Sequence, residues 1–153
     1  MELLAAIEGL ALVRALKVSF YAYPIVNALH IVAIGALFTS VYLMDLRLLG
    51  AFQSIPAPPL VALLRRIAIA ALVGAALTGL LMFSVRAGDY AAMPLFLAKM
   101  GLIVLGGVNF FAFTRFAGAG QGAQLSPVLK GSLVASMLIW TGVLLCGRFL
   151  GFL

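Results

Sequence analysis

The sequence predicts an all-α fold: an integral membrane four-helix bundle preceded by an N-terminal interfacial helix. Of the 153 residues, 65% are hydrophobic and only 9% are charged, a composition outside the range of soluble domains. The apolar residues gather in four segments long enough to cross a bilayer, and charged residues flank these segments. We therefore expect one domain, residues 1–153, with spans at approximately 24–44, 67–85, 94–114 and 131–147.

Local sequence signals define the individual elements. The segment Glu2–Lys17 is rich in Leu and Ala and favours helix, and we place it at the membrane interface. Pro24 and Pro94 each open a span, because proline is favoured in the first turn of a helix. Arg66 and Arg86 bound the second span. The fourth span lies in the same way between two cations of its own.

Two connectors separate the spans into hairpins. Ala51–Pro59 contains three prolines, which predicts a stiff, non-helical connection between the first two spans. Ala117–Gln124, with the sequence AGAGQGAQ, predicts a flexible loop between the last two. Four spans place both termini on the same side of the membrane. The compact Arg65-Arg66 pair favours a cytoplasmic location for the hairpin loops and an outside location for the termini.

The charge pattern indicates a lipid environment. The formal net charge is +6, but the basic residues stand singly or as the Arg65-Arg66 pair near segment ends, where cations meet anionic headgroups. This distribution favours the lipid bilayer, and no nucleic acid, as a partner. The lone Cys146 excludes an intrachain disulfide and a thiolate metal cluster. The first cations, Arg14 and Lys17, come after an acidic residue, whereas the positive residues of a cleaved signal peptide come first. We therefore expect the spans themselves to insert the protein into the membrane.

Small residues recur at four-residue spacing in the second span, as Ala70, Gly74 and Thr78 and again as a second stripe that ends at Gly79. Such stripes let membrane helices approach closely. The pattern is compatible with a homo-oligomer or a membrane partner protein, and equally with contacts inside the bundle.

The candidate site centres on His30, the only histidine of the chain. His30 lies in the 27-residue stretch Val18–Met44, which contains no Asp, Glu, Lys or Arg. An ionisable group inside a span is costly and marks a functional site by default. Asn27 lies on the same helix face as His30, and Lys99 is about as deep as His30, roughly 7–9 Å below the surface at ~1.5 Å per residue. Arg86 ends the second span at that surface.

These residue types match a porphyrin site. A neutral imidazole commonly ligates haem iron, so His30 is the predicted metal ligand and haem b the predicted cofactor. Asn27 would be the hydrogen-bonding neighbour of His30, and Lys99 and Arg86 would pair with porphyrin carboxylates. Two alternatives remain open: His30 fixes helix packing while Lys99 reaches the headgroups, or methionines near the same surface bind copper. No nucleophile–base pair is present, so no catalytic residue is predicted.

Three further polar residues have structural interpretations. We expect Asp45 to pair with Arg47 at the membrane interface or to contact lipid headgroups. We expect Asn109, in the third span, to link two helices by a hydrogen bond.

The segments YPIVNALHIVAIG, residues 23–35, and YLMDLRLLG, residues 42–50, resemble an uncharacterised family of small bacterial four-helix membrane proteins. That resemblance covers the whole chain and implies a multi-pass protein of the bacterial inner (cytoplasmic) membrane. More distantly, the first span is similar to HemJ-type protoporphyrinogen oxidases and to CopD-like copper-resistance proteins. The resemblance to HemJ-type proteins implies a haem-ligating role for His30 and a partner role for Lys99. The chain lacks further histidines, so one monomer has no bis-histidine haem.

The sequence thus predicts an inner-membrane protein that binds haem or a porphyrin through His30 and has a redox-associated role. The alternative is a non-enzymatic membrane subunit, or a small-solute carrier, in which the buried polar cluster is structural. An absorbance spectrum discriminates between the two, because only the first protein is coloured.

Overall fold

The structure, a computed structural model, describes residues 2, 6, 8–117 and 125–152. These residues form helices and no strands, which confirms the all-α class. Four helices are long and apolar enough to cross a membrane, so the protein is a multi-pass membrane protein. They are α3, α4, α6 and α7, and two shorter helices, α2 and α5, accompany them. The bounds are Ala11–Val18 for α2, Ala22–Leu49 for α3, Ala57–Val85 for α4, Ala87–Ala92 for α5, Pro94–Ala117 for α6 and Pro127–Leu150 for α7.

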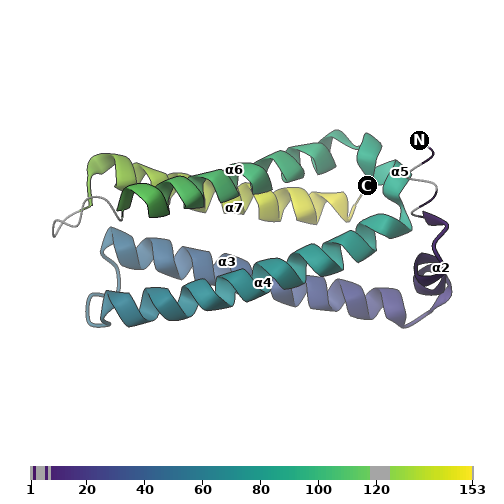
Figure 1. Cartoon of the computed structure of the whole chain (residues 1–153), viewed down its shortest axis with the longest axis horizontal. Coiled ribbons are helices and arrows are strands. Elements are labelled where there is room, and N and C mark those ends of the chain that lie inside the picture. Colours follow the sequence, from purple (N-terminus) through teal and green to yellow (C-terminus); the bar gives the residue numbers. More distant parts are fainter. Residues whose placement is uncertain (1, 3–5, 7, 118–124, 153) are drawn as a thin grey trace.

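The long helices form two antiparallel hairpins, α3 with α4 and α6 with α7 (Figure 1). The α3–α4 connection, the end of α6 and the start of α7 lie at one end of the molecule, whereas α2, α5 and the end of α7 lie at the other. Helix α3 also packs on α7, which joins the two hairpins. Along their described residues, the backbones of α4 and α6 are not close neighbours, although the Phe83 ring of α4 stacks on the Phe96 ring of α6 with centroids 5.3 Å apart. Helices α4 and α6 therefore lie at the two ends of the row and contact each other through side chains.

The helices extend beyond the predicted spans. Helices α3 and α4 have 28 and 29 residues, and α6 and α7 have 24 each. We expected 17–25 residues, which is wrong for the first two, because bilayer thickness limits only the apolar part of a helix. Backbone hydrogen bonding continues beyond the apolar part of a helix, so the helix extends into the polar interface. In α4 this extension includes Arg65 and Arg66. The point at which the membrane surface crosses each helix stays a prediction.

The connector between α3 and α4 is shorter than predicted. Pro58 and Pro59 lie in the first turn of α4, where a missing N–H costs no intrahelical hydrogen bond. Gly50 ends α3 with a φ of 111°, in the left-handed region that glycine adopts readily. The Arg47 Nε donates to the Ile55 carbonyl at 2.9 Å and fastens the connector. Of the loop predicted at Ala117–Gln124, residues 118–124 lie outside the described part of the chain.

A small core holds the α3–α4 hairpin together. Its buried side chains are Leu37, Val41, Met44, Leu64, Ala68 and Ala71. Many large apolar side chains on the outer helix faces are exposed, for example Val104 at 66% and Phe111 at 70%. Apolar faces of this kind are solvated by lipid in a membrane protein.

Polar side chains tie neighbouring helices. Asn109 Nδ2 donates to the Ser132 carbonyl at 3.1 Å, and the Ser132 hydroxyl donates back to Asn109 Oδ1 at 2.8 Å. This pair joins α6 to α7 and confirms that Asn109 links helices. The Tyr42 hydroxyl donates to the Met137 carbonyl at 3.0 Å, which joins α3 to α7.

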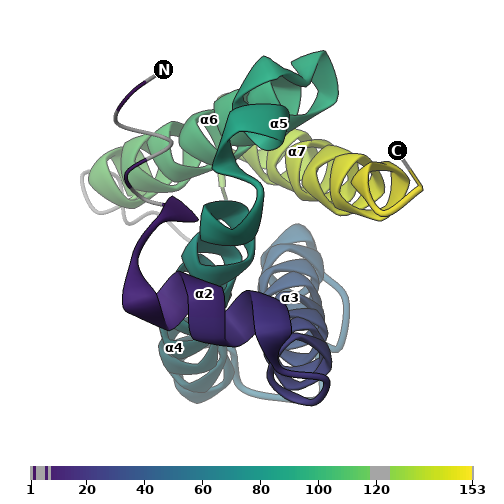
Figure 2. The ribbon, with the colours of Figure 1, turned by 90° about the vertical axis from the view of Figure 1, so that its right-hand side faces the viewer.

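Helix α2 lies across the ends of α3 and α4 (Figure 2). It buries Val13 and Leu16 against the bundle. Glu8 accepts the Gly88 backbone N–H at 3.1 Å and forms a salt bridge with Lys17 at 3.1 Å. The Gly88 amide, and after it Lys17, hold the pKa of the Glu8 carboxyl below its usual value. This crosswise position at the bundle end is the one expected of an interfacial helix, whereas α5 was not predicted.

Candidate functional site

His30 faces α4. Its imidazole is half-buried, and Nδ1 lies 2.8 Å from the Thr78 hydroxyl oxygen. A Cβ built on Gly79 would lie 3.1 Å from the His30 Cε1 atom. The absence of a side chain at Gly79 therefore makes room for the ring against the α4 backbone.

The hydrogen bonds of Thr78 indicate which ring nitrogen of His30 carries the proton. The Thr78 hydroxyl donates to the Gly74 carbonyl at 2.7 Å, within its own helix. A hydroxyl has one proton, and Thr78 uses it in the bond to the Gly74 carbonyl. The Thr78 oxygen must therefore accept a hydrogen bond from His30 Nδ1. The imidazole is then the Nδ1–H tautomer, inferred from this network, and Nε2 carries the lone pair.

Lys99 lies on the other hairpin and faces α7. A Cβ at Gly147 would lie 3.3 Å from the Lys99 Nζ atom and 3.6 Å from Cε. The half-buried Lys99 side chain therefore occupies space that is free because Gly147 of α7 has no side chain. Its ammonium thus lies against α7, whereas the imidazole of His30 lies against α4. The two residues thus come from different hairpins and each packs against a glycine.

The other two predicted residues make no hydrogen bond to this pair. Arg86 follows the end of α4 and forms a salt bridge with Asp89 at 2.8 Å, and both side chains are 58% exposed. Asp89 also raises the pKa of the Arg86 guanidinium. Asn27 is half-buried in α3, and its side chain makes no hydrogen bond to any described residue. The neighbour that hydrogen-bonds His30 is therefore Thr78, and the roles of Asn27 and Arg86 stay predictions.

Thr78 and Gly79 were not identified as site residues from the sequence. The signal for them was the pair of small-residue stripes in the second span. The structure uses these stripes inside the bundle: a Cβ at Gly74 would lie 3.6 Å from Ala33 Cβ on α3. The face that brings α4 close to α3 is thus the same face that receives the imidazole.

A second polar group lies near the other end of α3. Asp45 is 6% exposed, and its Oδ2 atom is buried without a hydrogen-bond partner in the described structure. From the sequence we expected Asp45 to pair with Arg47 or to contact lipid headgroups. That expectation is wrong, because Arg47 bonds to the connector and Asp45 faces an internal cavity.

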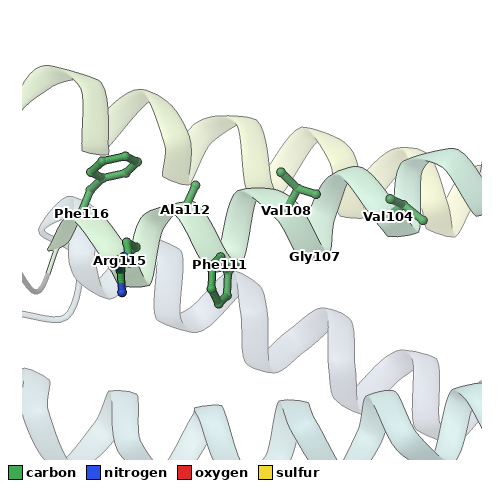
Figure 3. Close-up of a pocket in the computed structure, with 7 residues that line it drawn as sticks. All are labelled: Val104, Gly107, Val108, Phe111, Ala112, Arg115 and Phe116. Atoms are coloured by element: carbon green, nitrogen blue, oxygen red, sulfur yellow. The ribbon is translucent and has the colours of Figure 1, made fainter.

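Another hollow lies at the surface of α6 and shares Gly107 with the cavity of Asp45. Its volume is about 580 Å³, and it is lined by seven residues of α6 alone, between Val104 and Phe116 (Figure 3). Its only charged residue is Arg115, near the loop end of the helix. Because one helix supplies the whole lining, this hollow is a lipid-facing helix surface and not a site.

Acidic, cysteine and histidine side chains do not converge on a metal. Among the described residues, no group of three or more such side chains could hold a metal ion. A metal ion bound by His30 would therefore need a cofactor to provide most of its other ligands, as a porphyrin does for iron.

Comparison with known proteins identifies the family. No curated protein and no solved structure was found to be similar to the chain. A family model described as "Family of unknown function (DUF6644)" matches residues 10–153, and so includes all four long helices. The protein therefore belongs to this family, DUF6644, whose function is unknown.

Proposed function

We propose that this protein binds haem b, or a related porphyrin, inside the bacterial inner membrane through His30. The observation that supports the proposal is the hydrogen bond between His30 Nδ1 and Thr78, which directs the lone pair to Nε2. Histidines that ligate metals typically donate their other ring N–H to a fixed acceptor, which sets both tautomer and orientation. A single proximal histidine is sufficient to hold haem iron.

The residues around His30 fit a porphyrin in part. Lys99 is a half-buried cation, suited to a porphyrin carboxylate. Arg86 is already paired with Asp89, so it would have to exchange that partner for a carboxylate. Haem, when bound, supplies one-electron redox chemistry, whereas the contribution of the chain is to position the imidazole and exclude water.

An absorbance spectrum tests the proposal directly. The protein should be expressed with ample haem and purified through a histidine-free tag, so that His30 is the only imidazole present. We expect a Soret band that His30→Ala abolishes and Lys99→Ala weakens, because the lysine provides one ionic contact and the histidine the iron bond. Lys130→Gln, an exposed control near the start of α7, should leave the band unchanged.

A specific observation favours a second function, that of a non-enzymatic membrane subunit or small-solute carrier in which His30 is structural. The imidazole packs on Gly79 and bonds to Thr78, and neither of the two main hollows among the described residues borders it. In that case the purified protein is colourless, and His30→Ala lowers the free energy of unfolding by about 1–2 kcal/mol. A colourless wild type would refute the haem proposal.

A further inference from the structure

The carboxylate of Asp45 is a buried acidic group without a counter-ion among the described residues. The residue is 6% exposed, and Oδ2 has no hydrogen-bond partner. Its neighbour in sequence, Arg47, bonds to the Ile55 carbonyl and so does not neutralise it. A buried, unpaired carboxylate is strongly disfavoured, and inside a membrane bundle it marks a functional site.

Asp45 lines a cavity of about 140 Å³ to which all four long helices contribute. The cavity lies in the half of the bundle near the α3–α4 connector, where α4 and α6 both contribute to its wall. Most of its lining is apolar and includes Trp140. Of the polar lining residues, Asn109 and Ser132 hydrogen-bond to each other, as described above. Asp45, Ser136 and Arg65 remain available to an occupant.

The chemistry of this lining defines the occupant. The buried carboxylate requires a hydrogen-bond donor, best a positively charged one. A cavity of about 150 Å³ accommodates a molecule of benzene size, so a small organic ion fits. A hard metal ion does not fit, because such ions take six or more oxygen ligands and this lining offers few. An indole in the wall adds attraction for an organic cation.

We propose that the cavity binds a small organic ammonium ion, whose N–H groups donate to the carboxyl group of Asp45. The apolar wall contacts the carbon atoms of the ion, and the Ser136 hydroxyl is a further acceptor. This site is separate from His30 and does not depend on haem binding.

Arg65 supplies the competing explanation. It lines the same cavity, and a rotation of its side chain toward Asp45 would neutralise the carboxylate without any ligand. In that case Asp45 and Arg65 stabilise the bundle as a pair, and the cavity has no need of a cation. Replacement of Arg65 separates the two explanations, because it removes the pair but leaves the ammonium site.

Trp140 provides a local reporter, because it is the only tryptophan and it lines the cavity. We would titrate the full-length protein in detergent with methylammonium chloride and follow tryptophan fluorescence, with sodium chloride at equal concentration as the reference. We expect a saturable change with methylammonium alone. Asp45→Asn should weaken binding at least ~10-fold, and Asp89→Asn, a carboxylate at the opposite end of the molecule, should leave it unchanged.

Two further variants keep the test decisive if Asp45→Asn fails to fold. Ala68→Leu fills the cavity but retains the carboxylate, and it should abolish the saturable change. Arg65→Gln should retain or tighten binding, because it removes a competing cation. The proposal is overturned if methylammonium and sodium give the same response, if Ala68→Leu binds as wild type does, or if Arg65→Gln abolishes binding.

Discussion

The hydrogen bond between His30 and Thr78 can be tested by one nearly isosteric substitution. Thr78→Val keeps the shape of the side chain but removes the oxygen that lies 2.8 Å from His30 Nδ1. Hydrogen bonds between membrane helices contribute about 0.6 kcal/mol on average and up to about 1.7 kcal/mol. A buried donor left without a partner costs about 1–3 kcal/mol. Because His30 is only half-buried, we expect Thr78→Val to lower the free energy of unfolding by about 1–1.5 kcal/mol.

A double-mutant cycle isolates this bond from the other effects of the substitution. The cycle combines Thr78→Val with His30→Phe, and unfolding in mixed micelles is followed by circular dichroism. The expected coupling energy is about 1 kcal/mol. Thr114→Val is the matched control, since the Thr114 hydroxyl donates only to the Phe111 carbonyl of its own helix. We expect that control to cost less than about 0.5 kcal/mol.

If the effects of Thr78→Val and His30→Phe on the free energy of unfolding add to within about 0.3 kcal/mol, the hydrogen bond is refuted. Independent sites are additive to about that accuracy. If Thr114→Val lowers the free energy of unfolding as much as Thr78→Val does, the role of the His30–Thr78 hydrogen bond is also refuted. That result would show that the cost arises from the bond of the hydroxyl to its own helix, not from the contact with α3.

The remaining predictions test the tautomer of His30 and two other contacts. Nitrogen-15 NMR of the single histidine, His30, should show the Nδ1–H tautomer, and the opposite tautomer would contradict the Thr78 network. Gly106→Ala should cost about 1–3 kcal/mol of unfolding free energy, because the new Cβ would lie 3.3 Å from the tryptophan ring, whereas Gly107→Ala has open space and should be nearly neutral. The lowered pKa of Glu8 means that its stabilising contacts are present above the ordinary carboxyl pKa of 4.5 and are lost as the pH falls through the lowered value. The protection factors of the α2 amides, which are corrected for intrinsic exchange, should therefore fall in acid, and Glu8→Gln should remove this pH dependence; acid-insensitive protection in the wild type would contradict the role of Glu8.

The four long helices could be predicted because bilayer thickness imposes a simple rule on the sequence. A charge-free run of about 20 residues has few other structures open to it. The helix ends could not be predicted in the same way. Pro58 and Pro59 indicated a break, yet a first turn accepts prolines as readily as a loop does. The six residues of α5 are too few for a periodic pattern.

Partners across a helix interface were harder to predict than the helices. His30 was recognisable from the sequence, but Thr78 was not, because the register between α3 and α4 is set by packing. The error at Asp45 was avoidable. Residues two apart on a helix do not face each other, so Asp45 and Arg47 were never well placed to pair. The same geometry directs Asp45 inward while Arg47 reaches the connector.

Both polar groups belong to α3, one of the two helices that pack on two long neighbours. His30 and Asp45 are fifteen residues apart, or about 22 Å along a helix, so they form two sites and not one. A polar group is least costly where other helices cover it, whether it serves packing or binding. Loss of stability on substitution therefore does not distinguish the two roles. A Soret band at His30 and a saturable methylammonium response at Asp45 do distinguish them, because neither signal arises from packing.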